Sequence, residues 1–96
     1  MRIRFLASAE KDITTAIDWY LERSEPAAER FADQIDDALQ KIALAPDRFP
    51  SWDTLHRFLL LRRFPYYIAY RVESEYLLIV AVRHTSHDAD DWTLRS

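Results

Sequence analysis

The chain contains no glycine among its 96 residues, although average usage would supply about six or seven. Glycine lets a backbone adopt positive φ angles and approach a phosphate closely. The phosphate-binding loop of nucleotide hydrolases, the dinucleotide-binding fingerprint and the G-x-S-x-G turn of serine hydrolases all depend on it. These classes of enzyme are therefore excluded. Cysteine is also absent, which excludes disulfides, thiolate metal sites and cysteine nucleophiles.

The length of the chain predicts one domain, residues 1–96, with a hydrophobic core that is thin for its surface. The longest uninterrupted apolar run has seven residues, Tyr76 to Val82, whereas a membrane-spanning helix needs about 20. The first residues are soon followed by charged side chains and lack the apolar stretch of a signal peptide. We therefore expect a cytoplasmic protein that does not contact membranes.

Charge is distributed unevenly along the chain. Residues 8–45 carry nine acidic and four basic side chains, whereas residues 54–87 carry five arginines and two glutamates. This pattern predicts a surface with an acidic pole and a basic pole, although two solvated faces would produce the same pattern. The overall net charge of −3 argues against a protein that is basic throughout and binds nucleic acid in that way.

Apolar periodicity predicts a short strand and then two helices in the first half of the chain. Residues 2–6 favour the strand, and Ser8 is the expected N-cap of the first helix. Ser24 or Glu25 should cap a second helix, which ends at Ala45 before a proline. Because so few residues join the helices, we expect an antiparallel helical hairpin.

Three strand candidates follow a loop and are joined by the short turns typical of an antiparallel meander; they cover residues 57–63, 66–72 and 76–83. The last of them is apolar on both faces and should therefore be central. The predicted fold class is α+β, in the order β-α-α-β-β-β, with a helix hairpin packed on one face of a small, mainly antiparallel sheet. The opposite face should be open, and its apolar residues then require a cover from a partner.

A series of short motifs runs in order through nearly the whole chain: Ile3–Phe5, Ala9–Ile13, Asp18–Tyr20, Ala28–Phe31, Ala45–Pro50, Arg62–Val72, Leu78–Val82, His84 and Asp88–Trp92. This series resembles the RelE/ParE family of toxins from bacterial type II toxin–antitoxin systems, and is closer to the ParE-like branch. Some members of that family cut mRNA on the ribosome, whereas ParE-like members poison DNA gyrase. Both kinds are neutralised by an antitoxin whose C-terminal segment wraps the toxin and whose N-terminal part binds operator DNA.

The resemblance also identifies candidates for a ribonuclease site. Ribonuclease relatives carry an arginine where this chain has Tyr67, basic residues where it has the apolar residues 58–61, and a final group that corresponds here to Arg83, His84 or His87. RNA cleavage requires a general acid, a general base and cations around the scissile phosphate. Many ParE-like relatives carry two arginines after His84, where this chain reads Thr-Ser-His.

We therefore expect the toxin of a type II toxin–antitoxin module, a ParE-like inhibitor of DNA gyrase that acts by protein contact rather than as an enzyme. The alternatives are a ribosome-dependent endoribonuclease and an inactive relative kept as an antitoxin-binding module. No cofactor and no metal are expected, although His84, His87 and Asp88 could supply ligands. The candidates for contact with the target or the antitoxin are Arg57, Arg62, Arg63, Tyr67, Arg71 and Trp92; the arginines among them could instead pair with acidic residues of the helices.

Overall fold

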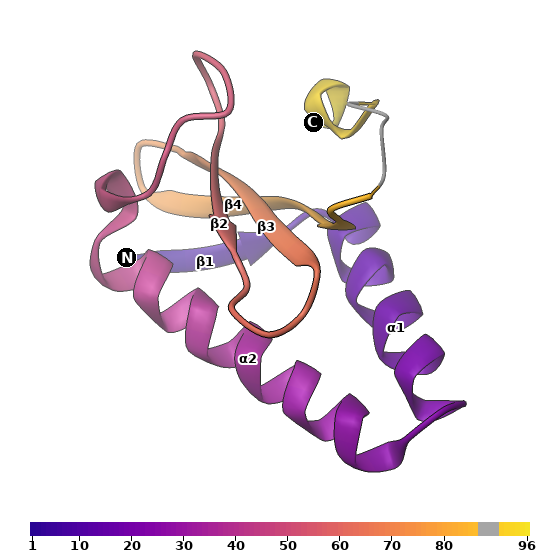
Figure 1. Cartoon of the computed structure of the whole chain (residues 1–96). Coiled ribbons are helices and arrows are strands. Elements are labelled where there is room, and N and C mark those ends of the chain that lie inside the picture. The colour runs from indigo at the N-terminus through magenta and orange to yellow at the C-terminus, as the bar shows by residue number, and fades with distance from the viewer. Residues whose placement is uncertain (87–90) are drawn as a thin grey trace.

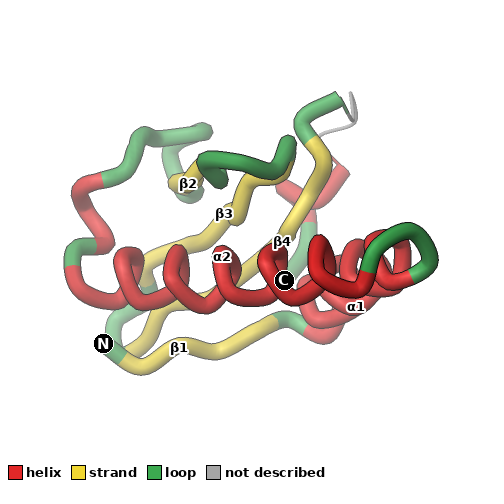
Figure 2. The backbone as a smooth tube through the Cα atoms, turned by 60° about the horizontal axis from the view of Figure 1, so that its bottom comes forward, coloured by secondary structure: helices red, strands yellow, loops and turns green. Residues whose placement is uncertain are grey.

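The fold was analysed in a computed structural model that describes residues 1–86 and 91–96. The strands form one sheet in the order β1-β4-β3-β2, in which β1 is parallel to β4 and the other pairs are antiparallel. Both α-helices lie on one side of this sheet (Figures 1 and 2), which confirms the α+β fold. The elements are β1 (Arg2–Phe5), α1 (Ala7–Leu21), α2 (Glu25–Leu44), η1 (Pro46–Arg48), β2 (Arg57–Leu60), β3 (Tyr66–Val72), β4 (Tyr76–His84) and η2 (Asp91–Leu94).

The two helices begin in different ways. Ser24 is the N-cap of α2 as predicted, because its hydroxyl oxygen accepts a hydrogen bond from the Ala27 N–H at 3.3 Å. The prediction that Ser8 caps α1 is wrong: the N-cap is Leu6, which makes no side-chain cap. Leu6 still donates its N–H to the Ile79 carbonyl, so the chain leaves the sheet and enters the helix without an intervening turn.

Strand β4 is central, as its apolar sequence predicted. Its residues 77–82 are all buried, with β1 on one side and β3 on the other. A bulge in the β3–β4 pairing leaves Val80 without a partner, since Tyr70 pairs with Ile79 and Ala69 with Ala81. Strict alternation is therefore interrupted, and both Val80 and Ala81 face away from the helices.

The main core lies between the helices and the sheet. The buried face of α2 contributes residues at helical spacing, and these pack against β3, β4 and the small residues of α1. An aromatic group closes one end, where the Tyr20, Phe31, Phe64 and Tyr66 rings meet at centroid distances of 5.0 to 6.3 Å. The residues of this core are Ala9, Ala16, Phe31, Ile35, Ala38, Ile42, Leu59, Leu61, Ile68, Tyr70, Leu77, Ile79 and Val82.

The expectation of an open face on the other side of the sheet is wrong. The C-terminal segment crosses that face (Figure 1) and inserts the fully buried Trp92 against it. Trp52, from the loop before β2, stacks nearly parallel on Tyr67 at 5.3 Å and meets Trp92 edge-on at 5.0 Å. The chain therefore builds a second, smaller core from its own aromatic residues.

Strand β2 is shorter than predicted. It ends at Leu60 rather than at Arg63, and Arg62 and Arg63 lie in the exposed connection to β3. Leu59 and Leu61 both lie in the main core, and the Leu61 N–H continues the pairing with β3 by donating to the Tyr66 carbonyl at 2.9 Å. Among the described residues none has a positive φ, so the chain makes its described turns without the conformations that favour glycine. The described helices include none long and apolar enough to cross a membrane.

Candidate functional site

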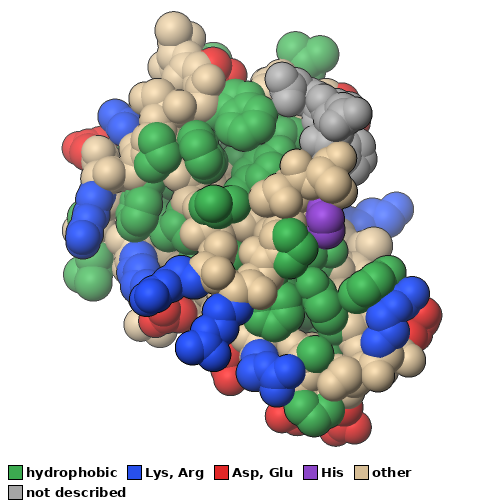
Figure 3. Space-filling model, in the orientation of Figure 1, with side chains coloured by type: hydrophobic (Ala, Val, Ile, Leu, Met, Phe, Trp, Pro, Cys, Tyr) green, Lys and Arg blue, Asp and Glu red, His purple; other side chains and the backbone are tan. Residues whose placement is uncertain are grey.

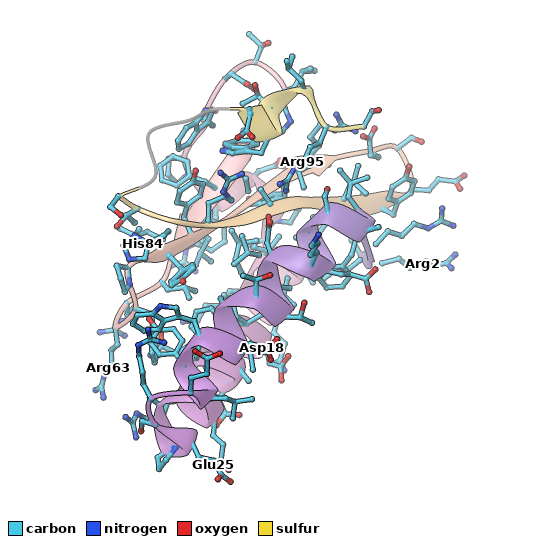
Figure 4. The ribbon with its side chains drawn as sticks, turned by 90° about the vertical axis from the view of Figure 1, so that its right-hand side faces the viewer. Arg2, Asp18, Glu25, Arg63, His84 and Arg95 are labelled. Atoms are coloured by element: carbon cyan, nitrogen blue, oxygen red, sulfur yellow. The ribbon has the colours of Figure 1, made fainter. Side chains whose placement is uncertain are left out.

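Two of the predicted ribonuclease residues line one groove between α1 and the end of β4. Arg83 and His84 lie there with Lys11, Trp19 and Tyr66, around a cavity of about 280 Å³. His84 stands at the end of β4 (Figure 4), and its ring meets that of Tyr66 edge-on at 5.1 Å. Burial, followed by the nearby Tyr20, raises the pKa of Tyr66 above its ordinary value, so its hydroxyl is protonated at neutral pH. His87 and Asp88, which with His84 could have supplied metal ligands, lie outside the described residues.

Hydrogen bonding in this groove limits what the two residues can do. The Ser86 N–H donates to Nδ1 of His84 at 3.0 Å, which places the proton of the neutral ring on Nε2. In that tautomer Nε2 can donate a hydrogen bond but cannot accept one. Arg83, whose side chain is only 12% exposed, forms an ion pair with Asp91 at 3.3 Å. The groove thus holds a hydrogen-bond donor, the Nε2–H of His84, and a cation that a carboxylate already engages.

Arg57, on the edge strand β2, and Arg71, on the internal strand β3, both bind backbone carbonyls of segments outside the sheet. Arg57 donates to the Phe49 carbonyl at 2.6 Å and so fixes the loop before β2. Arg71 pairs with Glu73 at 3.2 Å and donates to the Arg95 carbonyl at 3.4 Å. The alternative interpretation predicted that these arginines pair with acidic residues of the helices. Among the described contacts neither Arg57 nor Arg71 does so.

Tyr67 and Trp92 are core residues rather than surface residues. Tyr67 is 6% exposed and Trp92 is fully buried, and the Trp92 indole N–H donates to the Tyr67 hydroxyl at 3.0 Å. A hydrogen bond of this kind satisfies two polar atoms that would otherwise be costly to bury. The fold therefore offers neither side chain to a partner unless the C-terminal segment leaves the sheet.

Arg62 and Arg63 are the contact candidates that remain exposed. They border a groove between α2 and β2, with a cavity of about 370 Å³. Figure 3 shows Lys and Arg side chains gathered in a row on this face, over α2 and the β2–β3 connection. In Figure 4 Arg63 points away from the body of the molecule. The candidates therefore divide between the α1–β4 groove, strands β2 and β3, the second core and this basic groove.

Two polar features that stabilise the second core were not apparent from the sequence. Asp12 of α1 accepts the Val82 N–H at 3.1 Å and pairs with Arg95 at 2.8 Å, while Arg95 also donates to the Val80 carbonyl at 3.0 Å. Arg95 lies on the face of the sheet opposite the helices (Figure 4). Together Asp12 and Arg95 satisfy backbone groups of β4 beyond the end of β1 and hold the C-terminal segment in place.

His56 is the second of these features. It is 1% exposed, its Nδ1 lies 2.9 Å from an Asp53 carboxylate oxygen, and its ring meets Trp92 at right angles. Burial would raise the pKa of Asp53, but hydrogen bonds from the Leu55 and His56 N–H groups and the His56 ring together lower it below its ordinary value. A lone histidine between loop residues gives no sequence signal for such a role.

Comparisons with known proteins agree with one another. The family model described as the ParE toxin of the type II toxin–antitoxin system parDE matches residues 3–89. Toxin ParE2 of Mycobacterium tuberculosis, in strains CDC 1551 / Oshkosh and ATCC 25618 / H37Rv, is 34% identical over 84 residues, which cover 86% of this chain and 80% of the relative. A solved structure described as the chromosomal ParDE TA system from P. aeruginosa matches in fold with a TM-score of 0.76 and 20% identity, covering 88% of this chain and 95% of that one. The chain belongs to the ParE family of toxins of type II toxin–antitoxin systems.

Proposed function

We propose that this toxin acts in the cytoplasm by contact with DNA gyrase, and that a cognate antitoxin suppresses it by wrapping its surface. The antitoxin, and not the toxin, would contact operator DNA. Membership of the ParE family supports this reading. The solved structure of similar fold, described as a ParDE TA system, supports a partner antitoxin.

The choice of gyrase over the ribosome is supported by the residues that stand where ribonuclease relatives carry cations. Tyr67 stands where the resemblance places an arginine, and it is buried and hydrogen-bonded to Trp92. The preceding strand, where basic residues would stand, is Arg57–Leu60, and its single cation is engaged by the Phe49 carbonyl. Stabilising the charge that develops on a scissile phosphate requires cations at the site. Neither position supplies one here.

The experiment is controlled expression of the chain alone in bacteria, with growth and a DNA-damage reporter read together. We expect growth arrest with the reporter switched on, because a trapped gyrase leaves broken DNA. Purified toxin should then inhibit supercoiling by purified gyrase and increase the amount of cleaved DNA. Arrest with a silent reporter, together with unaffected gyrase, would contradict the proposal.

The second candidate function, mRNA cleavage on the ribosome, is favoured by one observation: Lys11, Arg83 and His84 border the same groove as Trp19. If His84 acts there as an acid or base, His84→Ala should lower mRNA cleavage by about 10²–10⁴-fold. Thr85→Ala, an exposed neighbour, is the matched control. Under the gyrase proposal both variants still arrest growth with the reporter on. Soluble, folded protein that causes no arrest would indicate the third reading, an inactive antitoxin-binding relative.

A further inference from the structure

One wall of the α1–β4 groove is a single row of exposed side chains on α1. Lys11, Thr15 and Trp19 follow one another at intervals of four residues, so they lie on the same face of the helix, and all three border the groove. Because the helix rises about 1.5 Å per residue, the first and last Cα atoms of the row are about 12 Å apart. A cation and an aromatic ring therefore stand at opposite ends of this wall.

Trp19 is half-exposed, and Arg23 holds its indole in place. The Arg23 guanidinium lies 3.7 Å from the centre of the ring, and an N–H of the same group donates to the Trp19 carbonyl at 2.8 Å. Among the described residues, Trp19 borders the groove and Arg23 does not, so the groove meets a part of the indole that the guanidinium leaves uncovered. An indole that is already fixed offers a platform on which another planar ring can stack.

The polar groups of the groove favour an anion. Lys11 is exposed, and no ion pair within residues 1–86 and 91–96 engages its ammonium group. Asp12, the acid that borders the groove, is already paired with Arg95 at 2.8 Å. The Nε2–H of His84 adds a hydrogen-bond donor on the wall formed by β4. The groove therefore keeps an uncompensated positive charge and a donor that an anionic ligand can use.

The dimensions of the groove suit a single nucleotide. Its cavity of about 280 Å³ is close to the lower limit of about 300 Å³ for pockets that bind small molecules. A ring at one end of the α1 row and an ammonium at the other match a base joined through its sugar to a phosphate. A cavity of this size holds one base and leaves no room for a second.

We propose that the α1–β4 groove binds a free nucleoside monophosphate. The base stacks on Trp19, the phosphate pairs with Lys11, and the Nε2–H of His84 donates to an oxygen of the ligand. This is a binding function without bond cleavage, so it differs from the second candidate function, in which the same groove would cut RNA. It does not rest on the proposed function, because neither gyrase nor an antitoxin takes part in forming the site.

The test uses the whole chain, labelled for NMR, and adenosine monophosphate as the probe. We expect saturable binding with shifts at the Trp19 indole N–H, Lys11 and His84. Adenosine, which lacks the phosphate, and ribose 5-phosphate, which lacks the base, should each bind about tenfold more weakly. Added salt should weaken adenosine monophosphate but not adenosine. No binding, equal binding of adenosine and its monophosphate, or shifts centred on Arg62 and Arg63 would overturn the proposal.

Two surface substitutions separate the parts of the ligand. Trp19→Leu should weaken adenosine and adenosine monophosphate alike, by about tenfold, and Lys11→Gln should weaken only the monophosphate, by about tenfold. The matched controls are Leu21→Ala, on the same helix at the same 49% exposure as Trp19, and Lys41→Gln, on α2 outside the groove. Both controls should leave binding unchanged. A control that weakens binding as much as its matched variant would overturn the proposal.

A short single strand of adenylates distinguishes a free nucleotide from one unit of a longer chain. It should bind with nearly the affinity of the monophosphate, because the groove holds one base. Affinity that rises more than about tenfold with strand length would overturn the proposal in favour of a nucleic-acid surface. Gyrase is absent from these assays, so a chain that arrests growth through gyrase but ignores the nucleotide refutes this inference alone. A chain that binds the nucleotide but leaves gyrase and growth unaffected refutes the proposed function alone.

Discussion

The two faces of the sheet carry cores of different construction. The helix-facing core joins thirteen buried residues from both helices, from three strands and, with Leu61, from the connection after β2, so each apolar contact is supported by several others. The opposite core has six buried residues, five from β3 and β4 and the sixth Trp92, which alone comes from outside the sheet. The first core therefore follows from secondary structure, whereas the second depends on one side chain and on the polar contacts that anchor it.

The stability of the second face of this thin domain is concentrated in a few side chains. A small chain buries too little surface to leave one face of its sheet exposed without cost. Here the C-terminal segment supplies the cover that was expected from a partner, with Trp92 inserted and Arg95 bonded to Asp12. Removing the Trp92 side chain tests most directly whether the second core depends on it.

Trp92→Ala should lower the free energy of unfolding by about 3–5 kcal/mol, as should Phe31→Ala in the helix-facing core, because both rings are fully buried. The two variants should differ in what they expose. Trp92→Ala releases Trp52 to water and shifts the tryptophan fluorescence to the red, whereas Phe31→Ala affects the helices first. Urea unfolding followed by fluorescence and circular dichroism measures both effects.

The control is Leu94→Ala, in the same segment but 87% exposed, which should change the free energy of unfolding by less than about 0.5 kcal/mol. If Trp92→Ala were no more destabilising than this control, the second core would contribute nothing to folding and the comparison would fail.

The next largest effect should come from Asp12, which joins the C-terminal segment to α1 and β4. Asp12→Ala should cost about 1–3 kcal/mol of unfolding free energy, because it leaves Arg95 and the Val82 N–H without their acceptor. Hydrogen exchange at Val82 should speed up more than exchange within α2. Asp18→Asn, an exposed acid on the same helix, is the control and should be close to neutral. Equal effects from both variants would mean that the Asp12–Arg95 pair does not anchor the segment.

Much of the helix-facing core could be predicted from the sequence. The spacing of Ala28, Phe31, Ile35, Ala38 and Ile42 marks one face of a helix, and all five are buried. The two-sided apolar run of β4 indicated a central strand for the same reason, since only a strand covered on both faces retains such a pattern. Where burial follows a regular period, the sequence predicts it.

The second core escaped prediction because no period marks it. Trp92 is a single apolar residue in a polar segment, and the bulge at Val80 breaks the alternation that would assign faces to β4. Asp12 is one of three acids on the first helix, and only the fold brings it to Arg95. The candidate contact residues show the same limit. Tyr67 and Trp92 are buried, whereas Arg62 and Arg63 lie in an exposed turn where the sequence had predicted a strand.

A smaller effect is expected from the buried hydroxyl of Tyr70 in the first core. Burial raises the pKa of Tyr70 to about 12, with Arg57 lowering it and Asp47 raising it, and its hydroxyl donates to the Pro46 carbonyl. Because the folded pKa lies above the ordinary value, the contribution to stability is complete below about pH 10 and is lost as the pH rises toward about 12. Tyr70→Phe should cost about 1 kcal/mol at neutral pH and reduce the alkaline loss.

Urea unfolding at several alkaline pH values checks this prediction, with Tyr76→Phe, at the half-buried start of β4, as the control. An alkaline loss of stability that is the same in Tyr70→Phe and in the parent chain would show that another group is responsible.

The smallest effect concerns Asp53, whose carboxylate positions His56 beside Trp92. Its pKa is lowered in the folded chain, so its contribution to stability is present above its ordinary pKa of 3.8 and is lost as the pH falls through the folded value. Acid should therefore loosen the second core before the first, and tryptophan fluorescence should change at a higher pH than helical circular dichroism. Asp53→Asn should flatten the acid dependence of stability, whereas Asp33→Asn, exposed on α2, should leave it unchanged. If the two signals move together in acid, the two cores unfold as one unit, and their different construction has no consequence for how the protein opens.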